Sequence, residues 1–149
     1  MERIMKYINR VYRASVIDRD QAFKDDGLCG VHISYIRLIC SQEGLTQDEI
    51  SKFLFVNKST VTRNLNKLEQ KGFIYREVDS DDKRIKRVFP REKSKLLYHK
   101  IMAYLDDWNN KITGFIPHEE EDFVIKILKN LAKEATYAVE ETKNNKEGR

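Results

Sequence analysis

Cysteine, proline and long apolar runs are all scarce in this sequence of 149 residues. Cys29 and Cys40 are too few for a disulfide framework, which favours a reducing cytoplasm. No apolar run approaches the roughly 20 residues that a membrane-spanning helix needs. The start at Met1-Glu2-Arg3 leads directly into an amphipathic pattern and has no signal-peptide character. We therefore expect a cytoplasmic protein without a membrane partner.

Catalytic signatures are also missing. The sequence contains no P-loop, no glycine fingerprint for dinucleotides, no His-Glu-x-x-His and no Gly-x-Ser-x-Gly. Its three histidines lie in different segments, and none is next to an evident nucleophile. The acidic run at 119–122 is better explained as the first turn of a helix, where the helix dipole favours anions. These absences argue against an enzyme and predict no cofactor.

Positive charge is present but unevenly distributed. The net charge of the chain is only +4, yet residues 58–95 contain twelve Lys and Arg against six Asp and Glu. A basic segment alone is most often a solvated face, whereas a basic segment on a DNA-reading motif indicates phosphate binding. The local pattern around this segment is therefore the deciding observation.

Residues 45–72 have the pattern of a helix-turn-helix. Thr46 and Glu49 have the Thr-x-x-Glu spacing of a capping box, which predicts a helix start. Ile50, Phe53 and Leu54 are then expected on one apolar face of that helix.

A second helix is predicted from about residue 58, with Asn57 as its N-cap and Gly72 as its stop. Val61, Leu65 and Leu68 form its inward stripe. Its other positions carry short hydrogen-bonding groups and cations, which suit base edges and phosphates. These positions are Lys58, Ser59, Thr60, Thr62, Arg63, Asn66 and Lys67.

Two β-branched or aromatic runs follow, at residues 73–78 and 85–89, with a polar, turn-rich segment between them. Helix, turn, helix and hairpin in this order predict a winged helix-turn-helix.

The stretch VNKSTVTRNLNKLEQKGFIYREVDSDDKR, residues 56–84, resembles the core of the MarR family of bacterial and archaeal transcription regulators. The resemblance covers nearly the whole chain, because that family adds helices before the winged helix and two long ones after it. It implies a mainly α fold with a small β-wing, and a homodimer whose first and last helices interleave. Phe89-Pro90-Arg91 and Ser94 depart from the family's usual Leu-Thr and glycine, so the resemblance does not define where the next helix starts.

We therefore expect one domain, 1–149, made of N-terminal scaffold helices at 1–42, a winged helix-turn-helix at 45–90 and dimerisation helices at 91–143. The expected function is sequence-specific binding of double-stranded DNA at an inverted repeat, most simply as a repressor. In the family that is resembled, the wing carries an Asp-x-Arg element whose arginine enters the minor groove. Asp82 and Arg84 match this element here, and we expect Asp82 to orient the side chain of Arg84. The predicted DNA-binding residues are Asn57, Lys58, Ser59, Thr60, Thr62, Arg63, Asn66, Lys67, Lys83, Arg84 and Lys86.

A small anionic aromatic effector is a further expectation, because that family binds aromatic acids beside its first helix. Arg10, Arg13 and His32 are the candidate ligand-binding residues. Cys29 and His32 form a Cys-x-x-His pair, but no compact set of three or four metal ligands is present, so we predict no metal site. The alternatives are a metal- or thiol-responsive regulator of the same fold, and a winged-helix module that binds protein.

Overall fold

The computed structural model describes residues 2–147 and divides the chain into two compact units, Met1–Leu105 and Asp106–Arg149. The boundary lies inside helix α5 (Glu92–Thr113), whereas the sequence suggested a change of role near residue 91. The single domain at 1–149 stays a prediction. No helix within residues 2–147 is long and apolar enough to cross a membrane.

The first unit begins with helix α1 (Ile4–Ala22), whose C-terminal end is followed by the buried Phe23. Helix α2 (Gly30–Ser41) begins directly after Cys29, which forms its N-terminal capping box with His32. The Asp20 carboxylate of α1 accepts a hydrogen bond from the Gly30 backbone N–H, which ties the two helices together.

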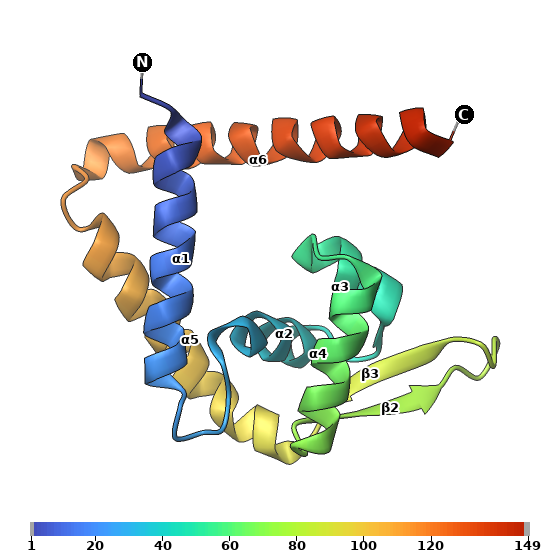
Figure 1. Cartoon of the computed structure of the whole chain (residues 1–149). Coiled ribbons are helices and arrows are strands. Elements are labelled where there is room, and N and C mark those ends of the chain that lie inside the picture. Colours follow the sequence, from blue (N-terminus) through green and yellow to red (C-terminus); the bar gives the residue numbers. More distant parts are fainter. Residues whose placement is uncertain (1, 148–149) are drawn as a thin grey trace. The chain divides into compact units, whose positions relative to one another are not determined.

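Helices α3 (Gln47–Leu54) and α4 (Lys58–Gln70) form the predicted helix-turn-helix (Figure 1). The capping box is confirmed, since the Glu49 backbone N–H donates to Thr46 Oγ1 at 3.2 Å and the Thr46 backbone N–H donates to Glu49 Oε2 at 2.8 Å. The Asn57 cap is also confirmed, because its Oδ1 accepts from the Thr60 backbone N–H at 2.9 Å. Both caps satisfy backbone donors that the first turn of a helix leaves free.

The apolar face of α3 is narrower than predicted. Ile50 is fully buried and Leu54 partly buried, but Phe53 is 57% exposed, so its place on the inward face was wrong. Burial at a helix position depends on which element packs there, and periodicity alone does not contain that information. On α4 the predicted stripe is confirmed, since Val61, Leu65 and Leu68 are all inaccessible to solvent.

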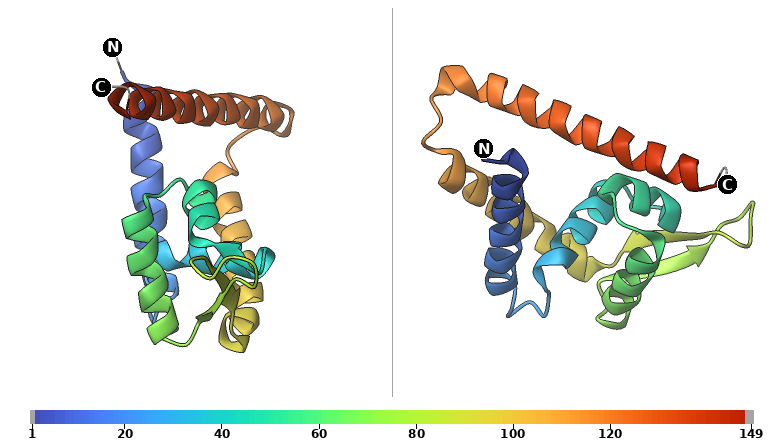
Figure 2. Two further views of the ribbon diagram at one scale, coloured as in Figure 1. Left: turned by 90° about the vertical axis from the view of Figure 1, so that its right-hand side faces the viewer. Right: turned by 45° about the horizontal axis from the view of Figure 1, so that its top comes forward.

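A three-stranded antiparallel sheet in the order β1-β3-β2 completes the winged helix. Strands β2 (Ile74–Val78) and β3 (Lys86–Pro90) form the predicted hairpin, with Arg76 opposite Val88. The first strand begins one residue later than predicted, and the second is shifted by one residue. The short strand β1 (Leu45–Thr46) was not predicted, because two residues carry no alternation to detect. The hairpin extends past α4 in Figure 1 and in the right-hand view of Figure 2.

The core lies between α2, α3, α4 and the sheet, with Ile36, Ile50, Leu65 and Val88 among its fully buried members. Helix α5 begins at Glu92, directly after β3, and is anchored by Ser94, whose hydroxyl donates to the Phe73 carbonyl at 2.6 Å. The first-unit part of α5 adds the buried Ile101.

The second unit contains the end of α5 and helix α6 (His118–Glu147). The first turn of α6 carries Glu119, Glu120 and Glu121, as the helix dipole favours. Phe123, Ile127 and Leu128 are exposed by 43 to 63%.

Candidate nucleic-acid interface

Helix α4 separates its residues into two faces. The buried face holds Val61, Leu65 and Leu68, and also Asn64, whose burial was not predicted from the sequence. Asn64 Nδ2 donates to the Thr60 carbonyl at 3.0 Å and lies 3.4 Å from the Tyr35 hydroxyl, so this amide is satisfied locally. The remaining positions that the sequence singled out lie outward, with only Thr60 partly covered. They are Lys58, Ser59, Thr60, Thr62, Arg63, Asn66 and Lys67.

Several of these outward side chains are already engaged within the protein. Ser59 Oγ donates to Asn57 Oδ1 at 2.9 Å, and Thr62 Oγ1 donates to the Lys58 carbonyl at 3.0 Å. Lys58 Nζ lies 3.1 Å from Asp48 of α3, an exposed ion pair of small energetic weight. Lys67 extends from the outward face near the end of the helix, where a cation also suits the helix dipole.

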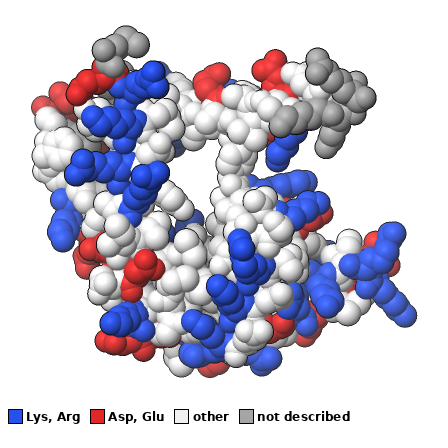
Figure 3. All heavy atoms as spheres, in the orientation of Figure 1, with Lys and Arg blue, Asp and Glu red and all other residues white. Residues whose placement is uncertain are grey.

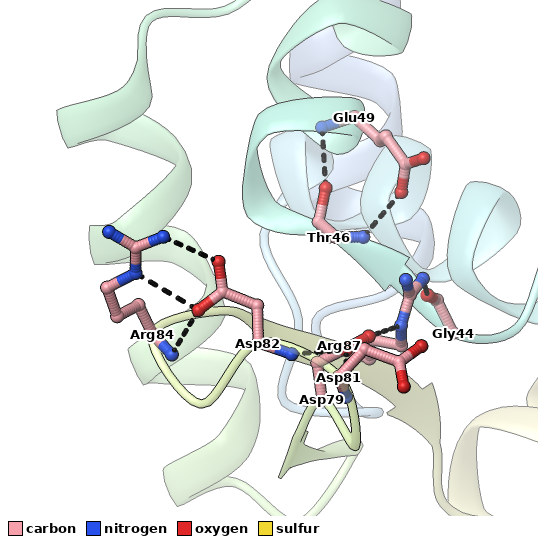
Figure 4. A network of polar contacts seen from close by, with 8 residues as sticks. All are labelled: Gly44, Thr46, Glu49, Asp79, Asp81, Asp82, Arg84 and Arg87. Carbon is pink, nitrogen blue, oxygen red and sulfur yellow. Dashed lines mark hydrogen bonds and ion pairs between the residues drawn. The ribbon is translucent and has the colours of Figure 1, made fainter.

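Arg84 and Asp82 form an ion pair at the tip of the wing. Arg84 Nε donates to Asp82 Oδ1 at 3.0 Å and Nη2 to Oδ2 at 2.9 Å, a two-point contact (Figure 4). Hydrogen bonds from the Arg84 side chain and backbone hold the pKa of Asp82 below its usual range. The Arg84 side chain is 90% exposed, so its charge is directed outward although its geometry is constrained.

A second carboxylate supports the wing loop. Asp79 Oδ1 accepts from the backbone N–H of Asp81 at 2.9 Å and of Asp82 at 3.0 Å, while Oδ2 pairs with Arg87 of β3. Arg87 Nη1 also donates to the Gly44 carbonyl at 2.9 Å, which joins the loop to the segment before β1 (Figure 4). Backbone N–H donors and then Arg87 lower the pKa of Asp79 to about 2. The roles of Asp79 and Arg87 were not predicted from the sequence, although an aspartate at the first position of a turn is typical of this kind of support.

Positive side chains lie over α4 and along the wing in the space-filling view (Figure 3). Lys83 and Arg84 are exposed at the wing tip, and Lys86 is exposed at the start of β3. A groove of about 300 Å³ lies between the wing and the start of α3, lined by Thr46, Gln47, Asp48, Arg84, Ile85 and Lys86. The arrangement offers hydrogen-bonding groups on a protruding helix and guanidinium and ammonium groups on a protruding hairpin.

A separate cavity of about 560 Å³ lies between α1, α2 and α4, and Tyr12, Arg19, Tyr35 and Arg63 are among its lining residues. The candidate ligand residues do not gather there. Arg10 and Arg13 are exposed on α1 outside the lining, and His32 is buried with its Nδ1 facing Cys29. Arg19, which was not among the predicted ligand-binding residues, is the arginine of α1 that lines the cavity.

The two cysteines differ in their surroundings. Cys29 is exposed with its Sγ 3.3 Å from His32 Nδ1, while burial raises the pKa of the half-buried Cys40 thiol to about 11. A thiol with a raised pKa is protonated near neutrality and is a poor nucleophile. Within residues 2–147, no three His, Cys, Asp or Glu side chains cluster in the manner of a metal site.

Comparison with known proteins agrees with this geometry. A sequence model of the MarR family matches residues 31–86. The chain is 28% identical to the HTH-type transcriptional regulator YybA of Bacillus subtilis (strain 168), over 92% of this chain and 94% of that protein.

Solved structures extend the agreement to the fold. A MarR protein from Peptoclostridium difficile superimposes with a TM-score of 0.87 and 25% identity, over 90% of this chain and 88% of that one. A MarR family transcriptional regulator from Listeria monocytogenes, solved in complex with 26-mer DNA, has a TM-score of 0.85 and 25% identity, over 90% and 89%. These relatives are transcription regulators, which is not a class of enzyme. The winged helix, the matched segment and the full-length similarity together lead to one conclusion: residues 31–86 match the MarR family, and the chain has the fold of that family's winged helix-turn-helix transcription regulators.

Proposed function

We propose that the protein binds double-stranded DNA sequence-specifically, as a homodimer on an inverted repeat, and represses transcription from that site. The observation that carries the proposal is the outward face of α4, where Thr62, Arg63 and Asn66 stand opposite the buried stripe. A winged helix that docks on protein would present apolar groups at these positions. The DNA complex of the Listeria monocytogenes relative supports the same use of this fold. The repression that we propose is the exclusion of the polymerase by a dimer bound over the promoter.

The experiment that tests this function is selection of bound sequences from a random duplex pool. The expected result is an enriched inverted repeat whose half-sites are centred about 10 bp apart, one turn of the double helix. Recovery of no preferred sequence by the folded protein would contradict the proposal.

In the proposed complex, α4 lies in the major groove and Arg84 enters the minor groove. Asn57, Lys58, Ser59, Thr60, Thr62, Arg63, Asn66 and Lys67 provide the contacts from α4 and its cap, and Lys83, Arg84 and Lys86 those from the wing. The support for Arg84 is its exposed guanidinium, held in place by Asp82. The minor groove separates little beyond A·T from G·C pairs, so the wing contributes affinity more than sequence choice.

Arg84→Ala is therefore expected to weaken cognate and non-cognate duplexes by similar factors. It should lower the salt slope of binding by about one unit per subunit, because one cationic contact is lost. Titrations at several salt concentrations measure both quantities. A loss confined to the cognate duplex would show that Arg84 reads sequence instead.

Asp82→Ala is expected to weaken binding although it removes a negative charge beside DNA, because the guanidinium of Arg84 then loses its fixed position. The matched control is Asp81→Ala, which removes the same charge from the same loop but has no side-chain contact with Arg84 in the described residues. Simple electrostatics predicts tighter binding for both variants. Tighter binding by Asp82→Ala would therefore refute the orienting role of Asp82.

A small anionic aromatic effector is the second part of the proposed function. The cavity between α1, α2 and α4 supports it, because Arg19 and Arg63 supply guanidinium groups and Tyr12 and Tyr35 supply rings. Arg63 would then join the effector cavity to the reading helix, so that an occupied cavity changes the presentation of α4.

The homodimer is supported by exposed apolar side chains on helices outside the winged helix. Ile4, Val11 and Ile17 of α1 and Phe123 and Leu128 of α6 are each at least half exposed. Their burial against a second copy would remove apolar surface from water. Light scattering at micromolar concentration should therefore give twice the 17.7 kDa mass of the chain. A mass of one chain under these conditions would exclude the dimer.

A further inference from the structure

Arg76 of β2 joins three elements of the winged helix through one guanidinium. Its Nη2 donates to Asn66 Oδ1 of α4 at 2.8 Å, and its Nη1 donates to Gln47 Oε1 of α3 at 3.2 Å. Its Nε donates to Glu69 Oε2 at 3.1 Å, and Arg76 lowers the pKa of that carboxyl. The Arg76 side chain is only 16% exposed, so the guanidinium stands behind the outward face of α4 and not on it.

The chemistry of the guanidinium determines which way the two amides point. Arginine carries N–H donors and no acceptor. The atom of Asn66 or Gln47 that faces it is therefore the amide oxygen, and the NH2 group of each points elsewhere. For Gln47 this direction leads to α4, where Nε2 donates to Thr62 Oγ1 at 3.1 Å.

The same network leaves the outward groups of α4 with a defined hydrogen-bonding character. The hydroxyl hydrogen of Thr62 is used by the Lys58 carbonyl, and one of its lone pairs by Gln47. Asn66 is exposed, with its oxygen held toward β2 and its NH2 group free of a described contact. Asn66 therefore presents donors, and Thr62 presents a methyl group and a single remaining lone pair.

We propose that Arg76 is a specificity-determining positioning residue, which sets Asn66 to read a base edge that accepts hydrogen bonds. Asparagine commonly reads adenine by donating to N7 and accepting from the N6 amino group at once, which needs its oxygen and nitrogen to face the base together. An oxygen held toward β2 by a guanidinium opposes that pose. The donors of Asn66 are matched by guanine, with N7 and O6, or by thymine, with O4. This inference rests on the proposed function, in which α4 lies in the major groove.

The decisive variant is Asn66→Asp, compared with the parent by selection from a random duplex pool. Aspartate keeps an oxygen for Arg76 but has no N–H to offer, and the exposed position leaves the core untouched. The parent is expected to prefer guanine or thymine at one position of each half-site. Asn66→Asp should lose that preference, should shift toward bases with a major-groove amino group, and should bind the parental site about tenfold or more weakly, as expected for a lost base contact. An unchanged base preference in Asn66→Asp would overturn the inference.

Arg76→Gln tests the positioning role directly. Glutamine can donate and accept, so the orientation of the Asn66 amide is no longer imposed, and adenine should become acceptable at the same position while the other positions stay as in the parent. Glu77→Gln is the matched control, since it changes an exposed neighbour on β2 and should reproduce the parental sequence. Thermal unfolding checks the fold of each variant. If Arg76→Gln does not fold, the base preferred by the parent decides the positioning role, because a preference for adenine at the position read by Asn66 would overturn it.

The proposed function and the role of Arg76 can be contradicted separately. A parent protein that enriches no sequence contradicts the proposed function itself. A parent that enriches an inverted repeat, together with an Asn66→Asp variant that enriches the same bases, contradicts only the role of Arg76 and Asn66.

Discussion

Acidification from pH 7 to pH 4 should lower the free energy of unfolding by about 3 kcal/mol through His32 alone, at about 1.4 kcal/mol per pKa unit. His32 is 2% exposed and is held at the start of α2, where its Nδ1 faces the Cys29 backbone N–H. Burial lowers its pKa to about 4, with Lys71 and Lys67 acting in the same direction and Asn64 and Asp20 opposing them.

The sign of this effect follows from the direction of the shift. The pKa of His32 is lower in the folded protein than the ordinary 6.5, so the unfolded chain binds the proton more readily between these values. The contribution of His32 is therefore fully present above pH 6.5 and is lost as the pH falls toward 4. Glu49, Glu69 and Asp79 have lowered pKa values, so their carboxyl groups change the free energy of unfolding at more acidic pH. We therefore assign the change between pH 7 and about pH 5 to His32.

Urea unfolding at several pH values measures this dependence. His32→Gln removes the titrating group and should make the stability nearly constant from pH 7 to about pH 5. His99→Gln is the matched control, because it makes the same substitution at an exposed position of α5. A slope that persists in His32→Gln would show that other groups carry the pH dependence.

Arg63→Ala should cost about 1–3 kcal/mol of binding free energy on the selected DNA site, as expected for an arginine that reads a base edge. Arg63 is exposed on α4, and its Nη2 lies 3.4 Å from Thr60 Oγ1, a long contact that leaves the guanidinium available. The fold should be retained, because Arg63 lies outside the buried stripe of α4. The loss should be larger on the selected site than on an unrelated duplex at the same salt concentration.

Two further variants identify what kind of contact Arg63 makes. Arg63→Lys keeps the charge but lacks the planar pair of donors, so it should recover non-specific affinity without recovering the base preference. Arg37→Ala removes an equal charge from the exposed side of α2 and should have little effect on the site preference. Equal weakening on all duplexes would assign Arg63 to phosphate. Unchanged affinity would contradict its place at the DNA and leave it to the cavity that it also lines.

The local features of this protein could be read from its sequence, because their causes lie within a few residues. The capping box of Thr46 and Glu49 and the cap of Asn57 each join positions three residues apart, and both occur as predicted. The Asp82–Arg84 contact spans two residues and is likewise present. The stripe of Val61, Leu65 and Leu68 follows from the helical period, and a period is a property of sequence.

Features that depend on what packs against an element were decided only by the tertiary structure. Phe53 shares a helical face with Ile50 by spacing, yet Ile50 is fully buried and Phe53 is 57% exposed. His32 suited a ligand-binding role by residue type, but it is buried at the start of α2, and that burial lowers its pKa. Arg76 looked like an ordinary strand residue, and its contacts with Asn66 and Gln47 join positions 10 and 29 residues apart. Spacing along the chain determines contacts within a turn of helix or a tight loop, whereas contacts between elements depend on how the apolar faces pack, and that packing sets the orientation of the groups that α4 presents.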